Sequence, residues 1–222
     1  MRSVLFAGLA SAGVVLALAA CGAMGPGGSA DEAASPKPLT GFAAQFVGSS
    51  HQPAPEATVR PTPGTWDDVA APDGYSMVVI AQGDDPTTAT LTAAVEHYAA
   101  EHGADLTVLP ARDHDEVERR IDEAAAAAPD LVVGVGDGVV DVFSLITAQY
   151  LETDFLVVGA QLPEPTHNVT AVVWPGAEFR GTGLGNDEAH ANAVTPSRAR
   201  KAVAAGTASV LHDLTGIVIE LG

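Results

Sequence analysis

Cysteine and aromatic residues are scarce in this sequence. Cys21 is the single cysteine among 222 residues, which excludes an intramolecular disulfide and any metal site built from several cysteines. Aromatic residues make up only 5% of the chain, so aliphatic and alanine side chains must form most of a core. Because 47% of the residues are hydrophobic, the chain has enough apolar side chains to form such a core.

Positive charge is also scarce. Lys37 and Lys201 are the only lysines, and 28 acidic residues against 10 basic ones give a formal net charge of −18. A surface this acidic repels the phosphates of nucleic acids and of anionic lipids. We therefore expect no nucleic-acid partner and a well-solvated acidic surface.

The N-terminus is typical of an export signal. Residues 1–21 read MRSVLFAGLASAGVVLALAAC, with Arg2 as a short basic region and a following apolar run that is short for a transmembrane helix. The run ends in Leu-Ala-Ala directly before Cys21, which resembles a bacterial lipobox. The pattern predicts a lipoprotein signal peptide over 1–20 and lipidation of Cys21, which would hold the mature chain on the extracytoplasmic face of the cell membrane.

Residues 21–72 are rich in Gly, Pro, Ser, Ala and Thr. This composition predicts a flexible tether, because it buries too little apolar surface to offset the entropy of ordering. Within it, the stretch LTGFAAQFVGSS could form a brief helix or a peptide that docks on the following domain. Trp66 is expected to pack on the edge of that domain.

From residue 73 to 222 the pattern changes to an alternation of strands and helices. Short β-branched runs predict strands, and apolar residues at helical spacing predict the helices between them. Gly103 is expected to end the first of these helices, and Thr195 with Pro196 to begin the last. The predicted strands are 75–81, 105–109, 130–135, 154–160, 168–174 and 215–221, and the predicted helices are 88–103, 113–129, 138–152 and 195–214.

Continuous apolar strands separated by helices indicate an α/β fold with a mostly parallel sheet covered on both faces. The prediction is a three-layer, doubly wound domain with the flavodoxin-like strand order 2-1-3-4-5. The place of the sixth strand is left open.

In open sheets of this kind, ligands bind beyond the carboxyl ends of the strands, near the point where the strand order reverses. Five residues are expected at that place and are the candidate ligand-binding residues: Asp84, Asp85, Gly136, Asp137 and Gln161.

The glycine-rich segment after the third strand does not fit two familiar sites. A dinucleotide fingerprint starting at Gly134 would need a glycine where Val139 stands, and neighbouring carboxylates oppose a phosphate. A phosphoacceptor site would need a hydroxyl and a lysine where Ala160 and Pro175 stand. The glycines could instead be structural, allowing a tight turn and a close helix.

The other polar clusters in the sequence do not identify a metal site or a catalytic site. The histidines lack the spacing of a zinc-binding helix, and no Ser-His-Asp arrangement is identifiable, so we expect neither an enzyme nor a cofactor. The segment DHDE at 113–116 could hold a divalent cation, or Asp113 could simply cap a helix. In the loop 174–190, a polar site could form from Glu178, Arg180, Asp187 and His190, or Glu178 and Arg180 could form only an exposed ion pair.

The segments PDLVVGVGDGVVDVFSLITAQYLETDFLVVGA and NVTAVVWPGAEFRGTGLG resemble the basic membrane protein (BMP) family of substrate-binding lipoproteins. That family resembles type I periplasmic binding proteins and includes purine-nucleoside receptors of ABC transporters. The resemblance implies a small polar solute, nucleoside-like in some members, and an ABC permease as partner. It covers residue 75 to about residue 185.

The sequence also departs from the family pattern. Family members that bind nucleosides carry an Asp and a Phe-Asn pair after the first strand, whereas this chain has GDDPTTAT, without Phe and Asn. The chain is also expected to supply one lobe, whereas the family has two that close on the ligand, so a second subunit would have to complete the site. The alternative is a non-catalytic envelope scaffold or interaction protein that has lost ligand binding.

Overall fold

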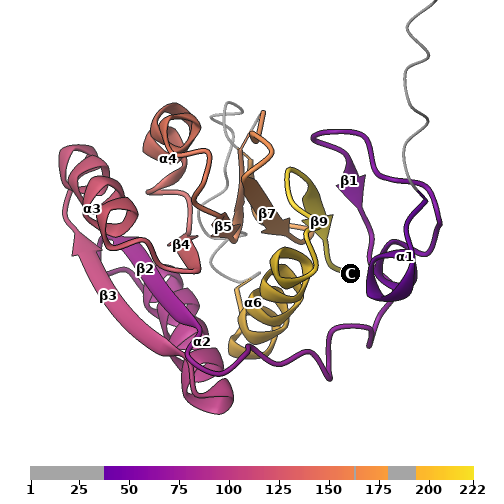
Figure 1. Ribbon diagram of the computed structural model, residues 1–222. Coiled ribbons are helices and arrows are strands. Elements are labelled where there is room, and N and C mark those ends of the chain that lie inside the picture. The colour runs from indigo at the N-terminus through magenta and orange to yellow at the C-terminus, as the bar shows by residue number, and fades with distance from the viewer. Residues whose placement is uncertain (1–37, 163, 180–193) are drawn as a thin grey trace, which may run out of the picture. The chain divides into compact units, whose positions relative to one another are not determined.

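A computed structural model describes residues 38–162, 164–179 and 194–222 (Figure 1). The predicted signal peptide and Cys21 lie outside the described residues. None of the described helices has both the length and the apolar character needed to cross a membrane.

The centre of the domain is a seven-stranded sheet in which every pair of neighbours is parallel. Its order is β1-β9-β7-β5-β4-β2-β3. The order predicted from the sequence is confirmed, and the sixth predicted strand, β9, lies beside β7. The strands are β1 Thr58–Val59, β2 Ser76–Gln82, β3 Asp105–Ala111, β4 Leu131–Val135, β5 Phe155–Val158, β7 Val169–Val173 and β9 Val218–Glu220, and a separate parallel pair is formed by β6 Ala160–Gln161 and β8 Glu178–Phe179.

Helices cover both faces of the sheet, which confirms the three-layer α/β prediction (Figure 1). Alternate residues of β2 enter different cores, with Val79 in one and Ile80 in the other. Since successive strand residues point to opposite faces, a strand covered twice must be apolar throughout. The helices α1 (Gly41–Val47), α2 (Pro86–His102) and α6 (Pro196–Leu211) lie on one face, and α3 (His114–Ala127) and α4 (Val140–Ile146) on the other.

Most helix ends follow the sequence signals. The Asp113 carboxylate accepts a hydrogen bond from the amide of Glu116 at 2.8 Å, and the Thr195 hydroxyl accepts one from the amide of Arg198 at 3.2 Å. Gly103 ends α2 with φ +67°, a conformation that glycine adopts without steric cost.

The helix predicted over 138–152 is shorter in the structure. It ends at Ile146 and continues as a 3₁₀ turn, η1 (Thr147–Gln149). The buried Asn168 explains the change, because its Nδ2 atom donates to the backbone oxygens of Thr147, Tyr150 and Thr153 at 3.0–3.2 Å. These bonds satisfy carbonyls that a continuing helix would have used itself.

Residues 38–72 differ from the predicted tether. Phe46 in α1 is fully buried, Trp66 is 8% exposed, and β1 pairs with β9. The brief docking helix and the packed Trp66 are thus present, because a few large side chains provide the apolar area that the overall composition lacks. The ordered domain therefore includes these residues and starts before the predicted boundary at residue 73.

Candidate functional site

The candidate site is the edge of the sheet where β2, β4 and β5 end. Ala81 of β2 pairs with Val135 of β4, and Val135 pairs with Val158 of β5, all in parallel. The loops that carry Asp84 and Asp137 therefore leave the sheet at the same edge, as the sequence predicts.

Asp85 is the N-cap of α2. Its Oδ1 atom accepts hydrogen bonds from the amides of Thr87 and Thr88 at 2.8 and 3.0 Å, and its Oδ2 atom accepts one from the Thr88 hydroxyl at 2.5 Å. Partial burial acts to raise the pKa of Asp85, but the bonds from Thr88 and Thr87 outweigh it, so the pKa lies below its ordinary value. Both carboxylate oxygens are therefore already engaged by the helix.

Asp84 and Asp137 are placed differently. Both are exposed, and within the described ranges neither carboxylate has a hydrogen-bond or ion-pair partner. An ionised carboxylate accepts hydrogen bonds only, through two oxygens. These two side chains are therefore available to donors on a ligand, such as hydroxyl groups.

The glycines after β4 have structural roles. A Cβ atom on Gly134 would lie 2.7 Å from the Phe143 ring of α4, so glycine is needed for the close approach of that helix. Gly136 has φ +77° and donates from its amide to the carbonyl of Val158 at 2.9 Å. The structural interpretation of this junction is confirmed, and it leaves Asp137 exposed at the tip of a short turn.

The structure brings some of the predicted residues together. Thr88 of α2 lies between the loop after β2 and the loop after β4. Its hydroxyl donates to the Asp85 carboxylate, and the same oxygen lies 3.6 Å from the position that a Cβ atom on Gly136 would take. Gln161 is half-buried in β6, beyond β5, where the chain turns out of the main sheet after Gly159 at φ +88°. Gln161 therefore lies in the separate β6–β8 pair and not on the loops that carry Asp84 and Asp137.

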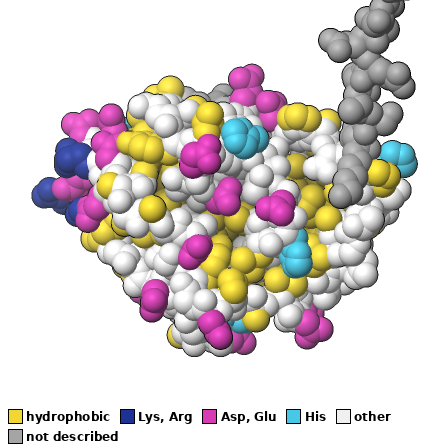
Figure 2. Space-filling model, viewed as in Figure 1, with side chains coloured by type: hydrophobic (Ala, Val, Ile, Leu, Met, Phe, Trp, Pro, Cys, Tyr) yellow, Lys and Arg dark blue, Asp and Glu magenta, His cyan; other side chains and the backbone are white. Residues whose placement is uncertain are grey.

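A hollow of about 610 Å³ lies beside Asp84, and sequence reasoning did not identify it. Its other charged lining residues are Arg112, Glu116 and Arg120; in Figure 2 Lys and Arg side chains gather at the left, where α3 lies. Hydrogen bonds from the Arg112 side chain, and then from its amide, lower the pKa of Glu116 to about 2. The signal that was overlooked is the spacing of Arg112 and Glu116, which are four residues apart.

Two other candidates were weighed from the sequence. In the described part of the chain, no three His, Cys, Asp or Glu residues are grouped closely enough to hold a metal ion, and Asp113 serves as a helix cap. Of the polar loop 174–190, Arg180, Asp187 and His190 lie outside the described residues, and only the backbone of Glu178 is described.

Comparison with known proteins gives one family and several distant structures. Residues 75–180, which are 106 of the 222, match the Bmp family model, described as ABC transporter substrate-binding protein PnrA-like. A comparison with curated proteins gives no match.

The similar solved structures are remote. They include an ABC transporter solute-binding protein from Aeropyrum pernix (19% identity, 46% of this chain and 28% of that chain, TM-score 0.40). A second, from Conexibacter woesei, is 25% identical over 46% of this chain and 35% of that chain, with a TM-score of 0.38. A putative lipoprotein fragment from Peptoclostridium difficile is 12% identical over 64% of this chain and 99% of that chain, with a TM-score of 0.46.

This chain covers about a third or less of the length of the two solute-binding proteins, at 35% and 28%. The family match spans β2 to β8 and includes the loops of Asp84 and Asp137. The resemblance to the BMP family that the sequence predicts is therefore confirmed over residues 75–180.

Proposed function

We propose that this protein is an extracytoplasmic solute-binding protein of the BMP type, anchored by lipid on Cys21. A small polar solute would bind at the edge formed by the carboxyl ends of β2, β4 and β5. The family match over these strands supports the type of protein, and the lipobox-like Leu-Ala-Ala-Cys supports the anchor. Cell fractionation tests the anchor: the Cys21→Ser chain should leave the membrane fraction, and an unchanged distribution would contradict it.

The observation that carries the ligand proposal is the pair of free carboxylates on neighbouring loops. Asp84 and Asp137 are exposed and unpaired among the described residues, whereas Asp85 beside them is engaged by its own helix. Two free acceptors favour a solute that offers several hydroxyl donors, such as a nucleoside or a sugar. Asp84 and Asp137 are exposed in the part of the chain that the structure describes, so a second subunit or an ABC permease would supply the wall that encloses the ligand.

Calorimetric titration with nucleosides and sugars tests this proposal. A binding solute should raise the melting temperature, and Asp84→Ala or Asp137→Ala should each weaken binding by about ten-fold or more, the value of one hydrogen bond to a charged group. Asp73→Ala is the matched control, because Asp73 is exposed and precedes β2 at the opposite edge of the sheet. Equal losses in all three variants would contradict the proposed site.

A second candidate, an envelope scaffold without a ligand, is favoured by one observation. The Asp85 carboxylate, a predicted ligand-binding group, is used as a helix cap. If the protein is such a scaffold, titration with nucleosides or sugars should give no heat of binding and no change in melting temperature. In a pulldown, a partner protein should remain bound to the Asp84→Ala and Asp137→Ala chains.

A further inference from the structure

The outer side of β3 has no neighbouring strand in the part of the chain that the structure describes, because β3 is the last strand of the sheet (Figure 1). At its two ends, the amide of Asp105 donates to the carbonyl of Tyr75 at 2.8 Å, and the amide of Gly83 donates to the carbonyl of Ala111 at 2.9 Å. Every second residue of a strand bonds to the same neighbour, so the odd-numbered residues of β3 bond inward to β2. The residues that direct their backbone groups outward are Leu106, Val108 and Pro110.

Only two of the residues along this edge offer both a free donor and a free acceptor. Pro110 has no amide hydrogen, and its carbonyl accepts a hydrogen bond from Nε of Arg120 at 3.1 Å. The amide of Ala104, just before the strand, already donates to the carbonyl of Ala99 at 2.9 Å. Leu106 and Val108 remain, and within the described ranges their N–H and C=O groups have no partner. Unpaired groups of this kind are a template for a further strand.

A second copy of the chain satisfies these groups in one register. Two identical strands related by a two-fold axis run antiparallel. With the axis at Thr107, Leu106 of each copy lies opposite Val108 of the other, and each such pair exchanges both N–H···O bonds. An axis at Leu106 would instead place Ala104 opposite Val108, and an axis at Val108 would place Pro110 opposite Leu106. Both alternatives lose bonds, because Ala104 and Pro110 have no free donor.

The side chains suit the same register. Val108 is 40% exposed although it is apolar, and Leu106 is only partly buried where it packs against the core on the α2 side. In the paired strands each of these side chains lies beside the other one of the second copy. Thr107, which is exposed, faces Thr107 across the axis. Cross-strand contacts of this kind stabilise antiparallel pairs.

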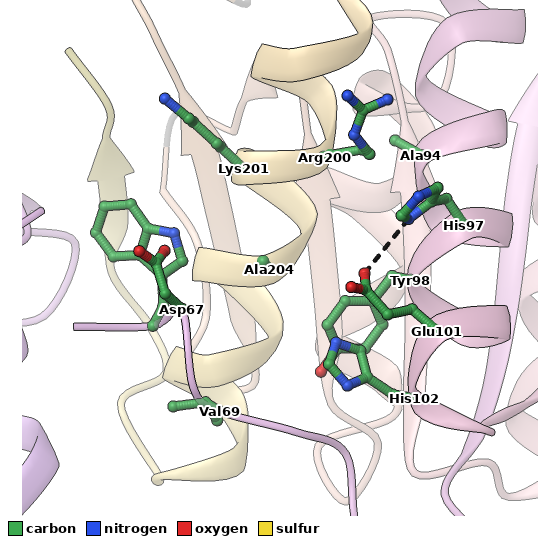
Figure 3. A pocket seen from close by; sticks show the side chains of 11 residues that line it. Asp67, Val69, Ala94, His97, Tyr98, Glu101, His102, Arg200, Lys201 and Ala204 are labelled. Carbon is green, nitrogen blue, oxygen red and sulfur yellow. Dashed lines mark ion pairs between the residues drawn. The ribbon is translucent and has the colours of Figure 1, made fainter. Parts of the chain in front are cut away.

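Charges at the two ends of β3 are complementary. Arg112, at the carboxyl end, is exposed and shares the Glu116 carboxylate with Arg119. At the amino end, the Glu101 carboxylate in the last turn of α2 faces His97 at 3.5 Å, as the dashed line in Figure 3 shows. The register about Thr107 brings Arg112 of each copy to the end of α2 in the other, where Glu101 lies. Opposite charges therefore meet twice in the pair of copies.

We propose that this protein forms a two-fold homodimer in which the β3 strands pair antiparallel about Thr107. One sheet then continues through both copies. Because the two strands run in opposite directions, the carboxyl edges of the two sheets point away from each other. The second copy bound in this way does not enclose a solute at Asp84, so dimerisation is independent of the proposed ligand site.

Sedimentation velocity and hydrogen exchange of the mature chain carrying Cys21→Ser test the dimer. The ionic strength is about 0.15 M, where a screening length of about 8 Å limits the repulsion between two acidic chains. The mean mass should rise toward that of a dimer as the concentration increases to about 0.5 mM, as expected of a small, weak interface. The amides of Leu106 and Val108 should become protected over the same range, whereas those of Thr107 and Leu109, bonded to β2, should be protected throughout.

A variant of Val108 separates pairing from folding. Val108→Pro removes an outward N–H that the folded monomer does not use, and proline is tolerated on an edge strand. The urea midpoint should therefore stay close to that of the wild type, whereas dimerisation should weaken by at least about ten-fold, because one bond is lost in each of the two pairs. Val108→Ala is the matched control, since it keeps the N–H, and it should weaken the dimer less.

Charge reversal tests the register. Arg112→Glu and Glu101→Arg should each weaken the homodimer by about three-fold, in keeping with exposed ion pairs. An equimolar mixture of the two variants should form mixed dimers in which one of the two charge contacts has its signs exchanged and remains attractive. Asp84→Ala should dimerise as the wild type does, which separates a failure here from a failure of the proposed solute site.

Three results would overturn the proposal. One is a monomer mass at every concentration up to about 0.5 mM, which would also leave the edge free for a different partner. Another is protection of the Leu106 and Val108 amides that does not change with concentration. The third is a Val108→Pro chain that folds and dimerises as tightly as the wild type.

Discussion

Asp84 and Asp85 show how strongly neighbouring identical residues can differ. Asp85 accepts three hydrogen bonds from Thr87 and Thr88, whereas Asp84 accepts none among the described residues. Asp85→Ala should therefore lower the free energy of unfolding by about 1 kcal/mol, the usual cost of losing an N-cap. Asp84→Ala should change it by less than about 0.5 kcal/mol, as expected of an exposed side chain. Urea denaturation at neutral pH measures both.

The Asp85 contribution should also depend on pH. Its pKa in the folded state lies below its ordinary value, so the unfolded chain binds the proton more readily than the folded one. The stabilisation is then present above the unfolded-state pKa of about 3.9 and is lost as the pH falls through the folded-state value. The stability difference between wild type and Asp85→Ala should accordingly shrink in acid, and a constant difference down to pH 2 would contradict the cap.

The sequence predicts that Asp84 and Asp85 lie at the carboxyl edge of the sheet, but it was not used to predict that Asp85 is the N-cap of α2. The signal was present, because Asp85 precedes a proline at the first position of α2, the same pattern that correctly identified Thr195 before α6. The exposure of Asp137 could not be predicted in this way, since it depends on the turn made by Gly136 and on the approach of Phe143 to Gly134.

At the scale of elements, α6 packs on the sheet through Gly206. A Cβ atom there would lie 2.6 Å from Cδ1 of Leu156 in β5 and 2.9 Å from Cγ2 of Val172 in β7. Gly206→Ala gains about 1 kcal/mol of helix propensity, but overpacking costs about 1–3 kcal/mol. The steric cost should exceed the gain, because the contacted side chains are fully buried and packed, so we expect net destabilisation of up to about 2 kcal/mol.

A double-mutant cycle distinguishes this steric cause from others. Leu156→Val shortens the side chain and removes both δ carbons, which lie 2.6 and 2.9 Å from the added carbon, so Gly206→Ala should cost less in that background than in the wild type. Urea unfolding of the four chains gives the coupling energy. A stabilised Gly206→Ala chain, or strictly additive effects, would show that α6 can move away from the sheet.

Local patterns predicted the longer elements best. The main strands from β2 onward are short apolar runs, the helices between them repeat apolar residues at helical spacing, and the alternation of the two indicates a parallel, flavodoxin-like sheet. The two-residue strand β1 has no periodicity to detect, and the early end of α4 depends on Asn168, which is distant in the sequence. Tertiary contacts of this kind cannot be inferred from local composition.

At the scale of the whole molecule, the fold class followed from composition and alternation, but the domain boundary did not. Proline and glycine are frequent throughout residues 21–72, so composition alone predicts a tether there and does not identify the packed residues 38–72. Phe46, Val59 and Trp66 decide the matter, because all three join the core on the α2/α6 side of the sheet. Other apolar side chains of the segment pack against the same core, and together they hold the segment on the domain; they are Leu39, Phe42, Ala43, Val47, Val69 and Ala71.

Truncation tests this boundary. A chain that begins at residue 38 keeps every described contact and should unfold cooperatively, at the same urea concentration as the full-length mature protein. A chain that begins at residue 73 loses Phe46 and Trp66 and leaves β9 without β1, its neighbour at the edge of the sheet. Full burial of each large apolar side chain stabilises a fold by about 2–3 kcal/mol, so the shorter chain should lose at least about 4 kcal/mol. Equal stability of the two chains would restore the predicted start at residue 73, because α1 and Trp66 would then lie on the domain without supporting it.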